Sequence, residues 1–214
     1  MDNDQNLLIL TIYIIGVTYV LYKAFQEIDK LITVEVDSDA INQQLEKKEL
    51  NDFMEVNFGF DPSYKLDELK DLKLTVKNKT NENPVYIEID WDKSLITDLE
   101  NNGRPMVWVN SDDMEEAPKS QDVGKIRPGQ NCEFKLSDEK IKDALFPEKD
   151  LKNVIKKGGK FNLQLYFKIE EANTGKSSSC YLPCRFKPIK LDWTEARTIA
   201  SVQSNLIGLN LQGK

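Results

Sequence analysis

The stretch from Asn6 to Phe25, NLLILTIYIIGVTYVLYKAF, limits the possible folds of this chain more than any other segment. No charged residue lies between Leu7 and Tyr22, and the interruptions at Thr11, Gly16 and Thr18 are ones that a membrane helix tolerates. A helix needs roughly 20 residues to cross a hydrocarbon core about 30 Å thick. The run reaches that length when its flanks are counted, so the sequence predicts a short membrane span.

The C-terminal end of this run has the residues of a membrane interface. Tyr19, Tyr22 and Phe25 suit an aromatic belt, and Lys23 can extend to the headgroups. A cleaved signal peptide and a buried core helix are the alternatives. No Lys or Arg precedes the run and no Ala-x-Ala-like cleavage site follows it before Tyr22, whereas a core helix would need a protein large enough to surround it. We therefore predict an uncleaved anchor.

The side of the membrane is predicted from few charges and from the cysteines. Lys23 and Lys30 follow the span and no basic residue precedes it, so the positive-inside rule places the rest of the chain in the cytoplasm. The cysteines, Cys132, Cys180 and Cys184, are too sparse for a disulfide framework. Cys180 and Cys184 are four residues apart and would lie about 13 Å apart in a strand, which favours buried thiols over a redox or metal pair.

Composition excludes several classes of function. The net charge is −7, so nucleic-acid binding is not expected. The chain contains no histidine, so histidine-based nucleophile activation and histidine-ligated zinc are not expected. No Gly-rich phosphate loop or dinucleotide fingerprint occurs. We expect a protein that is not an enzyme and uses no cofactor. A carboxylate-only enzyme remains an alternative, and it would need two neighbouring acids in a deep pocket.

Between the span and the main domain, the pattern first stays helical and then changes. An i, i+3, i+4 spacing that includes Leu31 and Ile32 predicts that the helix continues as a stalk to about Thr33, so that residues 1–32 form anchor and stalk. A short strand over 33–37 and a helix over 40–50, capped by Asp37 or Ser38, are predicted next. Residues 33–52 then form a connector, or a helix packed on the domain edge.

Residues 53–190 alternate apolar and polar side chains with a period of two, which predicts antiparallel strands with one face on a core. The strand over 84–91 is expected to return beside that over 72–78, after a turn-rich break, and the Pro128-Gly129 pair suits a type II turn. The predicted strands are 53–60, 72–78, 84–91, 105–109, 131–136, 161–170 and 178–186, the last two forming a hairpin.

A helical insertion is predicted at 138–157. Ser137 with the acids that follow it suits a helix start, Pro147 interrupts the helix, and Gly158-Gly159 ends it. Together with short turns, this pattern indicates a mainly β fold, an antiparallel β-sandwich at 53–190 with one helical excursion.

The strand order and the stretch Ile-Arg-Pro-Gly-Gln-x-x-x-Phe-x-Leu at 126–136 resemble the immunoglobulin-like sandwiches of bacterial and plant membrane-tethered or stress-related proteins. The resemblance covers roughly 53–187 and concerns the fold. The Cys-Trp-Cys core signature of antibody domains is missing.

Two features suggest binding. The tail, residues 191–214, has apolar residues at helical spacing, which predicts either a helix that closes the sandwich or a docking segment for a protein partner through Trp193, Ile199, Val202 and Leu206. Acidic side chains at two loops supply the oxygen ligands that calcium prefers, and the residues are Asp90, Asp92, Asp112 and Asp113. Solvated acidic loops are the simpler explanation of the second feature.

The anchor, the predicted sandwich and the absent catalytic residues together favour a membrane-anchored, non-catalytic accessory, scaffold or assembly protein. Its helix would contact membrane lipid, and its β-sandwich would contact a protein partner within a membrane complex. A calcium- or ligand-binding sensor that uses the acidic loops is the alternative function.

Overall fold

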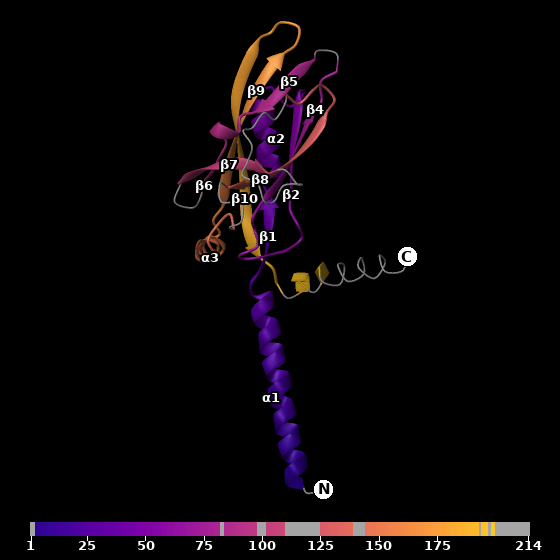
Figure 1. The fold of residues 1–214 in the computed structure, drawn as a ribbon, viewed down its shortest axis with the longest axis vertical. Coiled ribbons are helices and arrows are strands. Elements are labelled where there is room, and N and C mark those ends of the chain that lie inside the picture. Colours follow the sequence, from indigo (N-terminus) through magenta and orange to yellow (C-terminus); the bar gives the residue numbers. More distant parts are fainter. Residues whose placement is uncertain are drawn as a thin grey trace, which may run out of the picture. The chain divides into compact units, whose positions relative to one another are not determined.

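The computed structural model describes residues 3–81, 84–97, 102–109, 125–138, 144–192, 194–196 and 198–199. The chain divides into two compact units, one made of Met1–Ile32 with Lys190–Lys214 and the other of Thr33–Ile189 (Figure 1).

The first unit contains one long helix, α1 (Asn3–Ile28), which confirms the predicted helix over the apolar run. The predicted stalk is wrong, because α1 ends at Ile28 and Leu31 begins a strand, β1 (Leu31–Val36). Leu191 donates its backbone N–H to the Leu31 carbonyl at 3.1 Å. This pairing, and the β-branched residues of β1, favour the extended conformation over another helical turn.

The second unit is mainly β. Its elements after β1 are α2 (Ser38–Lys47), β2 (Met54–Gly59), β3 (Tyr64–Lys65), β4 (Leu72–Asn78), β5 (Val85–Ile89), the 3-10 helix η1 (Trp91–Lys93), β6 (Leu95–Thr97), β7 (Gly103–Val109), β8 (Asn131–Asp138), α3 (Glu148–Lys157), β9 (Phe161–Glu171) and β10 (Ser177–Lys190).

One antiparallel sheet runs through these strands in the order β2-β4-β8-β7-β6-β9-β10-β1-β3, and β5 pairs with β9 beside this path. β7 pairs with β6 through its first residues and with β8 through its last, so it joins two halves of the sheet. The sheet curls back on itself, because the ring of Phe58 on β2 lies 4.9 Å from that of Phe186 on β10 although the two strands lie near opposite ends of the order.

The inner faces of the two halves form the core. Along β4, β9 and the second half of β10, from Leu182 onward, every second side chain is buried, as the period-two pattern predicts. Trp91 and Phe134 pack edge-on at 5.3 Å, and Phe161 stacks on Phe186 at 5.0 Å. The first of these ring contacts connects η1 with β8, and the second lies within the β9–β10 pair.

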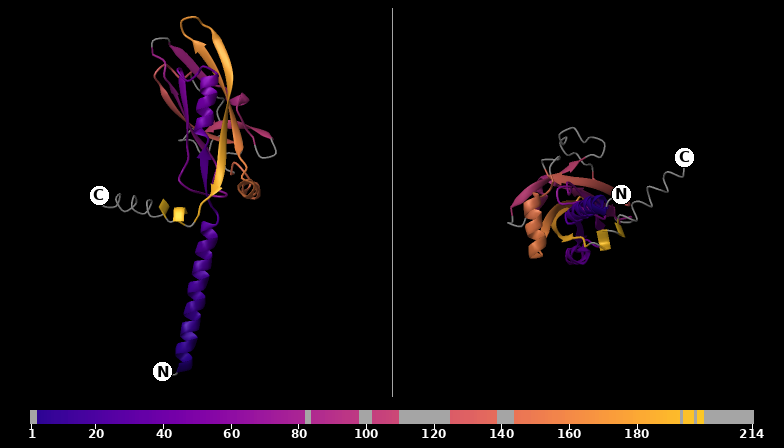
Figure 2. Two further views of the ribbon diagram at one scale, coloured as in Figure 1. Left: turned by 180° about the vertical axis from the view of Figure 1, so that it is seen from behind. Right: turned by 90° about the horizontal axis from the view of Figure 1, so that it is seen from below.

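Several local predictions are confirmed. β9 and β10 form the predicted hairpin, paired from Phe161↔Phe186 to Glu170↔Ser177, and their paired ribbon is visible from behind in Figure 2. The predicted type II turn has Gly129 at φ +72°, a conformation that favours glycine. The helix end at Gly158 is also confirmed, since this residue is the left-handed C-cap of α3.

The predicted hairpin partner of the strand over 84–91 is wrong. The strand itself exists as β5, but it pairs with β9 and not with β4, in a register that sets Ile87 opposite Ile169. The sequence does not distinguish the two possible partners, because alternation determines which side chains point inward and does not determine which strand lies next to β5. The end of the predicted strand, Trp91, instead begins η1.

The predicted helical insertion at 138–157 begins too early. Ser137 and Asp138 belong to β8, and Ser137 donates its hydroxyl to the Lys70 carbonyl at 3.0 Å. Residues 139–143 lie outside the described part, and α3 begins at Glu148, directly after Pro147. Proline suits the start of a helix and not its interior, which fits the start of α3 directly after Pro147.

Residues 33–52 are part of the second unit. This agrees with the second of the two predictions for this segment, a helix packed on the domain edge. Asp37 caps α2, its carboxylate accepting the Ala40 backbone N–H at 3.2 Å. Ile41 and Leu45, one turn apart, are 2% and 1% exposed. α2 is therefore held by burial of its apolar face and not only by its cap.

A buried asparagine ties three segments together. Asn78, at the end of β4, is 0% exposed. Its Nδ2 donates to the Val85 carbonyl at 2.6 Å and to the Ile126 carbonyl at 3.1 Å, and its Oδ1 accepts from both the N–H and the hydroxyl of Thr80. The sequence showed only a turn-rich break here, whereas the structure shows the link between β4 and the start of β5.

Asn78→Ala is expected to lower the free energy of unfolding by about 2–4 kcal/mol, because it removes the Asn78 donor from the buried Val85 carbonyl and the acceptor from the N–H and hydroxyl of Thr80. The Ile126 carbonyl keeps the Ile87 N–H as a donor. Urea denaturation of the full chain in detergent, followed by tryptophan fluorescence, measures the change. Asn57→Ala is the matched control, since Asn57 is exposed and bonds only to Glu55 among the described residues. Equal effects of the two substitutions would contradict the structural role of Asn78.

Candidate functional site

The first functional feature is α1. Gln5–Ile28 is long and apolar enough to cross a membrane by length and composition, with a mean hydropathy of 1.9, and none of this apolar window is buried within the protein. Within its own unit, this window therefore lacks the cover that a core helix has. Large apolar side chains such as Leu8, Ile15 and Val20 are more than half exposed, so something other than this protein's own core has to cover them.

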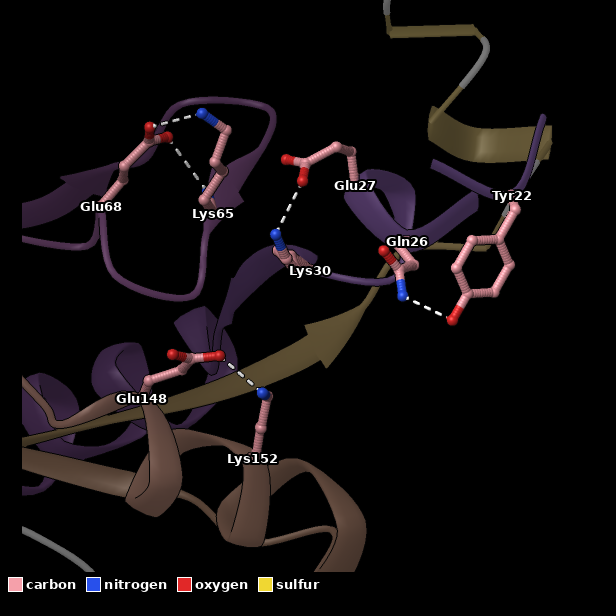
Figure 3. Close-up of polar contacts among 8 residues, drawn as sticks. All are labelled: Tyr22, Gln26, Glu27, Lys30, Lys65, Glu68, Glu148 and Lys152. Atoms are coloured by element: carbon pink, nitrogen blue, oxygen red, sulfur yellow. Dashed lines mark hydrogen bonds and ion pairs between the residues drawn. The ribbon is translucent and has the colours of Figure 1, made fainter. Parts of the chain in front are cut away.

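Polar side chains contact one another around the C-terminal end of α1. Gln26 donates to the Tyr22 hydroxyl at 2.8 Å, and Lys30 forms an ion pair with Glu27 at 2.7 Å (Figure 3). Lys190 reaches Asp29 at 2.9 Å within the same unit. Figure 3 also draws two exposed pairs of the second unit, whose contribution to stability is small.

The second candidate feature is a groove on the outer face of the sheet in the second unit, here called the outer groove. Its volume is about 650 Å³, within the usual range for binding pockets. Its lining comes from α2, η1, β6, β9 and β10, and the residues are Gln44, Lys48, Asp92, Lys93, Leu95, Gln164, Tyr181 and Pro183.

Strand register builds the floor of the outer groove. Leu95 on β6 lies opposite Gln164 on β9, which lies opposite Pro183 on β10, so these residues form one row across three strands. The next row on β9 and β10 pairs Tyr166 with Tyr181, whose rings meet edge-on at 4.6 Å. Outward-pointing residues of neighbouring strands thus give a floor of mixed apolar and amide character.

Buried residues hold both walls of the outer groove. Trp91 is 2% exposed in the core, and it fixes η1, from which the next residues, Asp92 and Lys93, project to the surface. Ser94 donates its hydroxyl to the Asp90 carbonyl at 2.8 Å and accepts the Tyr166 N–H at 3.1 Å. This serine joins η1 to β9.

The opposite wall comes from the end of α2. The buried side chains of Ile41 and Leu45 set the rotation of the helix, and Gln44 and Lys48 follow on the adjoining side, where they line the groove. The amphipathic pattern of α2 therefore decides which of its polar side chains reach the outer groove.

A charged cluster borders the outer groove. The carboxylate of Asp90 pairs with Lys168 at 3.1 Å and with Lys93 at 3.3 Å. Lys93 also lies 4.6 Å from the centre of the Tyr166 ring, a cation–π distance. Burial by itself raises the pKa of Asp90, but the hydrogen bonds from Lys168 and Lys93 outweigh it, so the pKa lies below its ordinary value of 3.8.

The lowered pKa of Asp90 predicts a pH dependence. Its contribution to stability is fully present above the ordinary value of 3.8 and is lost as the pH falls through the lower value of the folded protein. Asp90→Asn is expected to be less stable than the unchanged chain at neutral pH, and the difference is expected to shrink below about pH 4. Urea denaturation across this range measures it, and a difference independent of pH would contradict the prediction.

The structure describes part of the predicted calcium set. Asp90 is held by two lysines and Asp92 lines the outer groove, whereas Asp112 and Asp113 lie outside the described residues. Across the described ranges, no group of three or more His, Cys, Asp or Glu side chains is arranged to hold a metal ion. The calcium site stays a prediction.

The predicted docking residues of the tail are mostly outside the described part. Ile199 lies in a short helical stretch and is half-buried, whereas Trp193, Val202 and Leu206 are not described. Whether this tail closes the domain or docks to a partner stays open.

The cysteines are free thiols. Cys184 is buried, which confirms the expectation for this residue, and burial raises the pKa of its thiol well above the ordinary value. Cys132 and Cys180 are half-buried, and burial raises the pKa of both thiols. No metal-binding arrangement of these thiols occurs among the residues described.

Sequence reasoning missed the outer groove. One signal was present, because the confirmed alternation of β9 and β10 puts Tyr166 and Tyr181 on the outward face, and Tyr181 is 49% exposed. A large aromatic residue on the solvent side of a strand is typical of a binding surface.

Comparisons with known proteins do not assign a family. No family model and no curated protein matches the chain. Among solved structures, it resembles the CooA pilin subunit from enterotoxigenic Escherichia coli with a TM-score of 0.25 and 11% identity, over 57% of this chain and 79% of that chain. A similarity of this size establishes neither a shared fold nor a shared function.

Proposed function

We propose that this protein is a membrane-anchored, non-catalytic accessory or assembly protein. Its second unit, Thr33–Ile189, here called the β unit, is presented to a protein partner within a membrane complex. The observation that carries the proposal is the exposed apolar surface of α1, none of whose membrane-length window is buried. Such a surface needs lipid or another apolar partner in water. α1 therefore supplies the location, and the β unit supplies the binding surface.

The outer groove supports the binding part of the proposal. Exposed tyrosine is enriched at protein interfaces, and Tyr181 lies beside a proline, a leucine and two glutamines in this groove. The residues of the groove come from an ordered sheet and two packed walls, so the surface is formed before a partner arrives.

Two finer statements belong to the same proposal. We propose that the curled antiparallel sheet is an immunoglobulin-like sandwich, on the basis of its strand alternation and its Arg-Pro-Gly-Gln turn. We also propose that the β unit lies on the cytoplasmic side, on the basis of Lys23 and Lys30 after the span and of three free thiols.

Lysine-directed crosslinking of the full chain in native membranes, with mass spectrometry, tests this function. The expected result is a recurrent membrane-complex partner crosslinked to the β unit, with the exposed Lys48 and Lys93 among the sites. Lys149 and Lys156 on α3 serve as internal controls, since they are on a different element. Recovery of only uncrosslinked monomer in mild detergent would overturn the proposal.

A further inference from the structure

We propose that the outer groove binds an extended polypeptide segment of the partner, in which one acidic and one basic side chain flank an apolar one. The inference rests on the proposed function and names the chemistry of its binding site. Charge complementarity, the floor of the groove and its two glutamines carry it.

The charges of the outer groove separate into engaged and unengaged groups. Lys93 pairs with Asp90 and lies against the Tyr166 ring, so its charge is already matched. Lys48 on the α2 wall and Asp92 on the η1 wall are exposed and form no ion pair with any residue that the structure describes. One cation and one anion therefore remain on the two walls of one groove.

A segment that matches both charges needs a carboxylate toward Lys48 and an ammonium or guanidinium toward Asp92. A segment with two like charges would meet one attraction and one repulsion, which is the basis of discrimination between partners. The protein as a whole is acidic, with a net charge of −7. Lys48 therefore offers an acidic side chain of the partner a local attraction on a surface that otherwise repels it.

The floor suits the apolar part of such a segment. Leu95 and Pro183 are half-buried at the two ends of one cross-strand row, and the exposed Tyr181 ring stands in the next row. An apolar side chain laid over these residues removes water from both partners. The Tyr181 side chain loses little conformational freedom when it makes such a contact, because tyrosine has only two side-chain torsions.

The glutamines suit a polypeptide backbone. The side-chain amides of Gln44 and Gln164 line the groove and form no hydrogen bond within the described ranges. Each amide offers two donors and one acceptor oxygen, which is the complement of a peptide unit. A volume of about 650 Å³ is also large for a bound ion and suits a short segment of chain.

Three fluorescent peptides and four proteins test the proposal. The peptides are Ser-Glu-Thr-Leu-Thr-Lys-Ser and its forms with two Glu or with two Lys, acetylated and amidated at their ends. Alternate residues face one side of an extended chain, so the charged residues and the leucine share a face, and the two charges lie about 13 Å apart. The proteins are the full chain and its variants Asp92→Lys, Lys48→Glu and Tyr181→Ala, each in detergent micelles, with binding read by fluorescence anisotropy.

The expected result is a matched preference in each protein. The unchanged chain prefers the Glu/Lys peptide, Asp92→Lys prefers the Glu/Glu peptide, and Lys48→Glu prefers the Lys/Lys peptide, each by about three- to ten-fold, because each exposed charge pair contributes modestly. The peptide can enter in either direction, and this pattern does not depend on the direction. Tyr181→Ala is expected to weaken the binding of all three peptides by about ten-fold.

Absence of binding by every peptide, or binding without the matched preferences, overturns the proposal. Thermal unfolding of each variant confirms that the fold is intact, and both charge variants are at exposed positions where substitutions change stability little. If the peptides fail while crosslinking still recovers a partner on the β unit, the proposed function stands and the outer groove is not its site. If crosslinking fails and the peptide pattern holds, the groove binds chain segments without a membrane complex.

Discussion

Replacing both Ile14 and Ile15 with aspartate is expected to move the protein from the membrane pellet to the soluble fraction. The two residues lie at the middle of the uncharged run of α1 and are both exposed. A charged residue at the centre of a membrane helix costs about 3 kcal/mol, and each isoleucine contributes roughly 0.5 kcal/mol in the opposite direction. The double substitution therefore changes the free energy of insertion by about 7 kcal/mol, which is enough to abolish a short span.

Carbonate extraction followed by immunoblotting of pellet and supernatant measures this change. The matched control replaces Gln5 and Gln26 with aspartate, since these residues flank the apolar run and are expected to stay outside the hydrocarbon. If the Ile14 and Ile15 variant stayed in the carbonate-resistant pellet, the role of α1 as the anchor would be refuted. If the protein were found with its N-terminus removed after the helix, the signal-peptide alternative would hold instead.

Phe186→Ala is expected to cause the largest loss of stability in the β unit, about 3–5 kcal/mol of unfolding free energy. Phe186 is 0% exposed, and its ring contacts those of Phe58, Phe60 and Phe161 at 4.9, 5.6 and 5.0 Å. The substitution leaves a cavity where β2 meets β9 and β10. It therefore weakens the closure of the curled sheet as well as the packing of one side chain.

Urea denaturation followed by circular dichroism measures this loss. Arg185→Ala is the matched control, because Arg185 is the preceding residue on the same strand and faces the solvent. Its effect is expected to stay within about 0.5 kcal/mol. A loss below 1 kcal/mol for Phe186→Ala, on the order of a surface substitution, would show that the ring cluster does not hold the sheet closed.

The local structure of this chain follows from its residues. The apolar run of α1, the alternation of β4, the β9–β10 hairpin and the turn at Gly129 were all predictable, because each depends on neighbours in sequence. The end of α1 and the start of α3 were predicted less well. At the end of α1 a short apolar pattern fits both helix and strand, and a sheet partner decides between them. Before α3, Ser137 and Asp138 extend β8, and Pro147 suits the start of the helix.

The pairing of the strands did not follow from the residues. β5 has the alternation that the sequence predicts, yet it lies against β9, more than 70 residues later, and not against β4. The short strands β3 and β6 have two and three residues, too few for a periodic pattern. Asn78 sits in a segment that looks like a simple turn, and only the approach of Val85 and Ile126 makes it a buried link.

The candidate binding site shows the same division. The sequence alone determined the candidate membrane span, because the free energy of moving an apolar run out of water depends on its composition and length. It also determined which side chains of β9 and β10 point outward. Only the tertiary structure decided that Lys48, Asp92 and Tyr181 border one groove, since they come from α2, η1 and β10 and no local pattern relates them. Cross-strand register and the burial of Trp91 and Leu45 bring these elements together, and both are properties of the packed sheet.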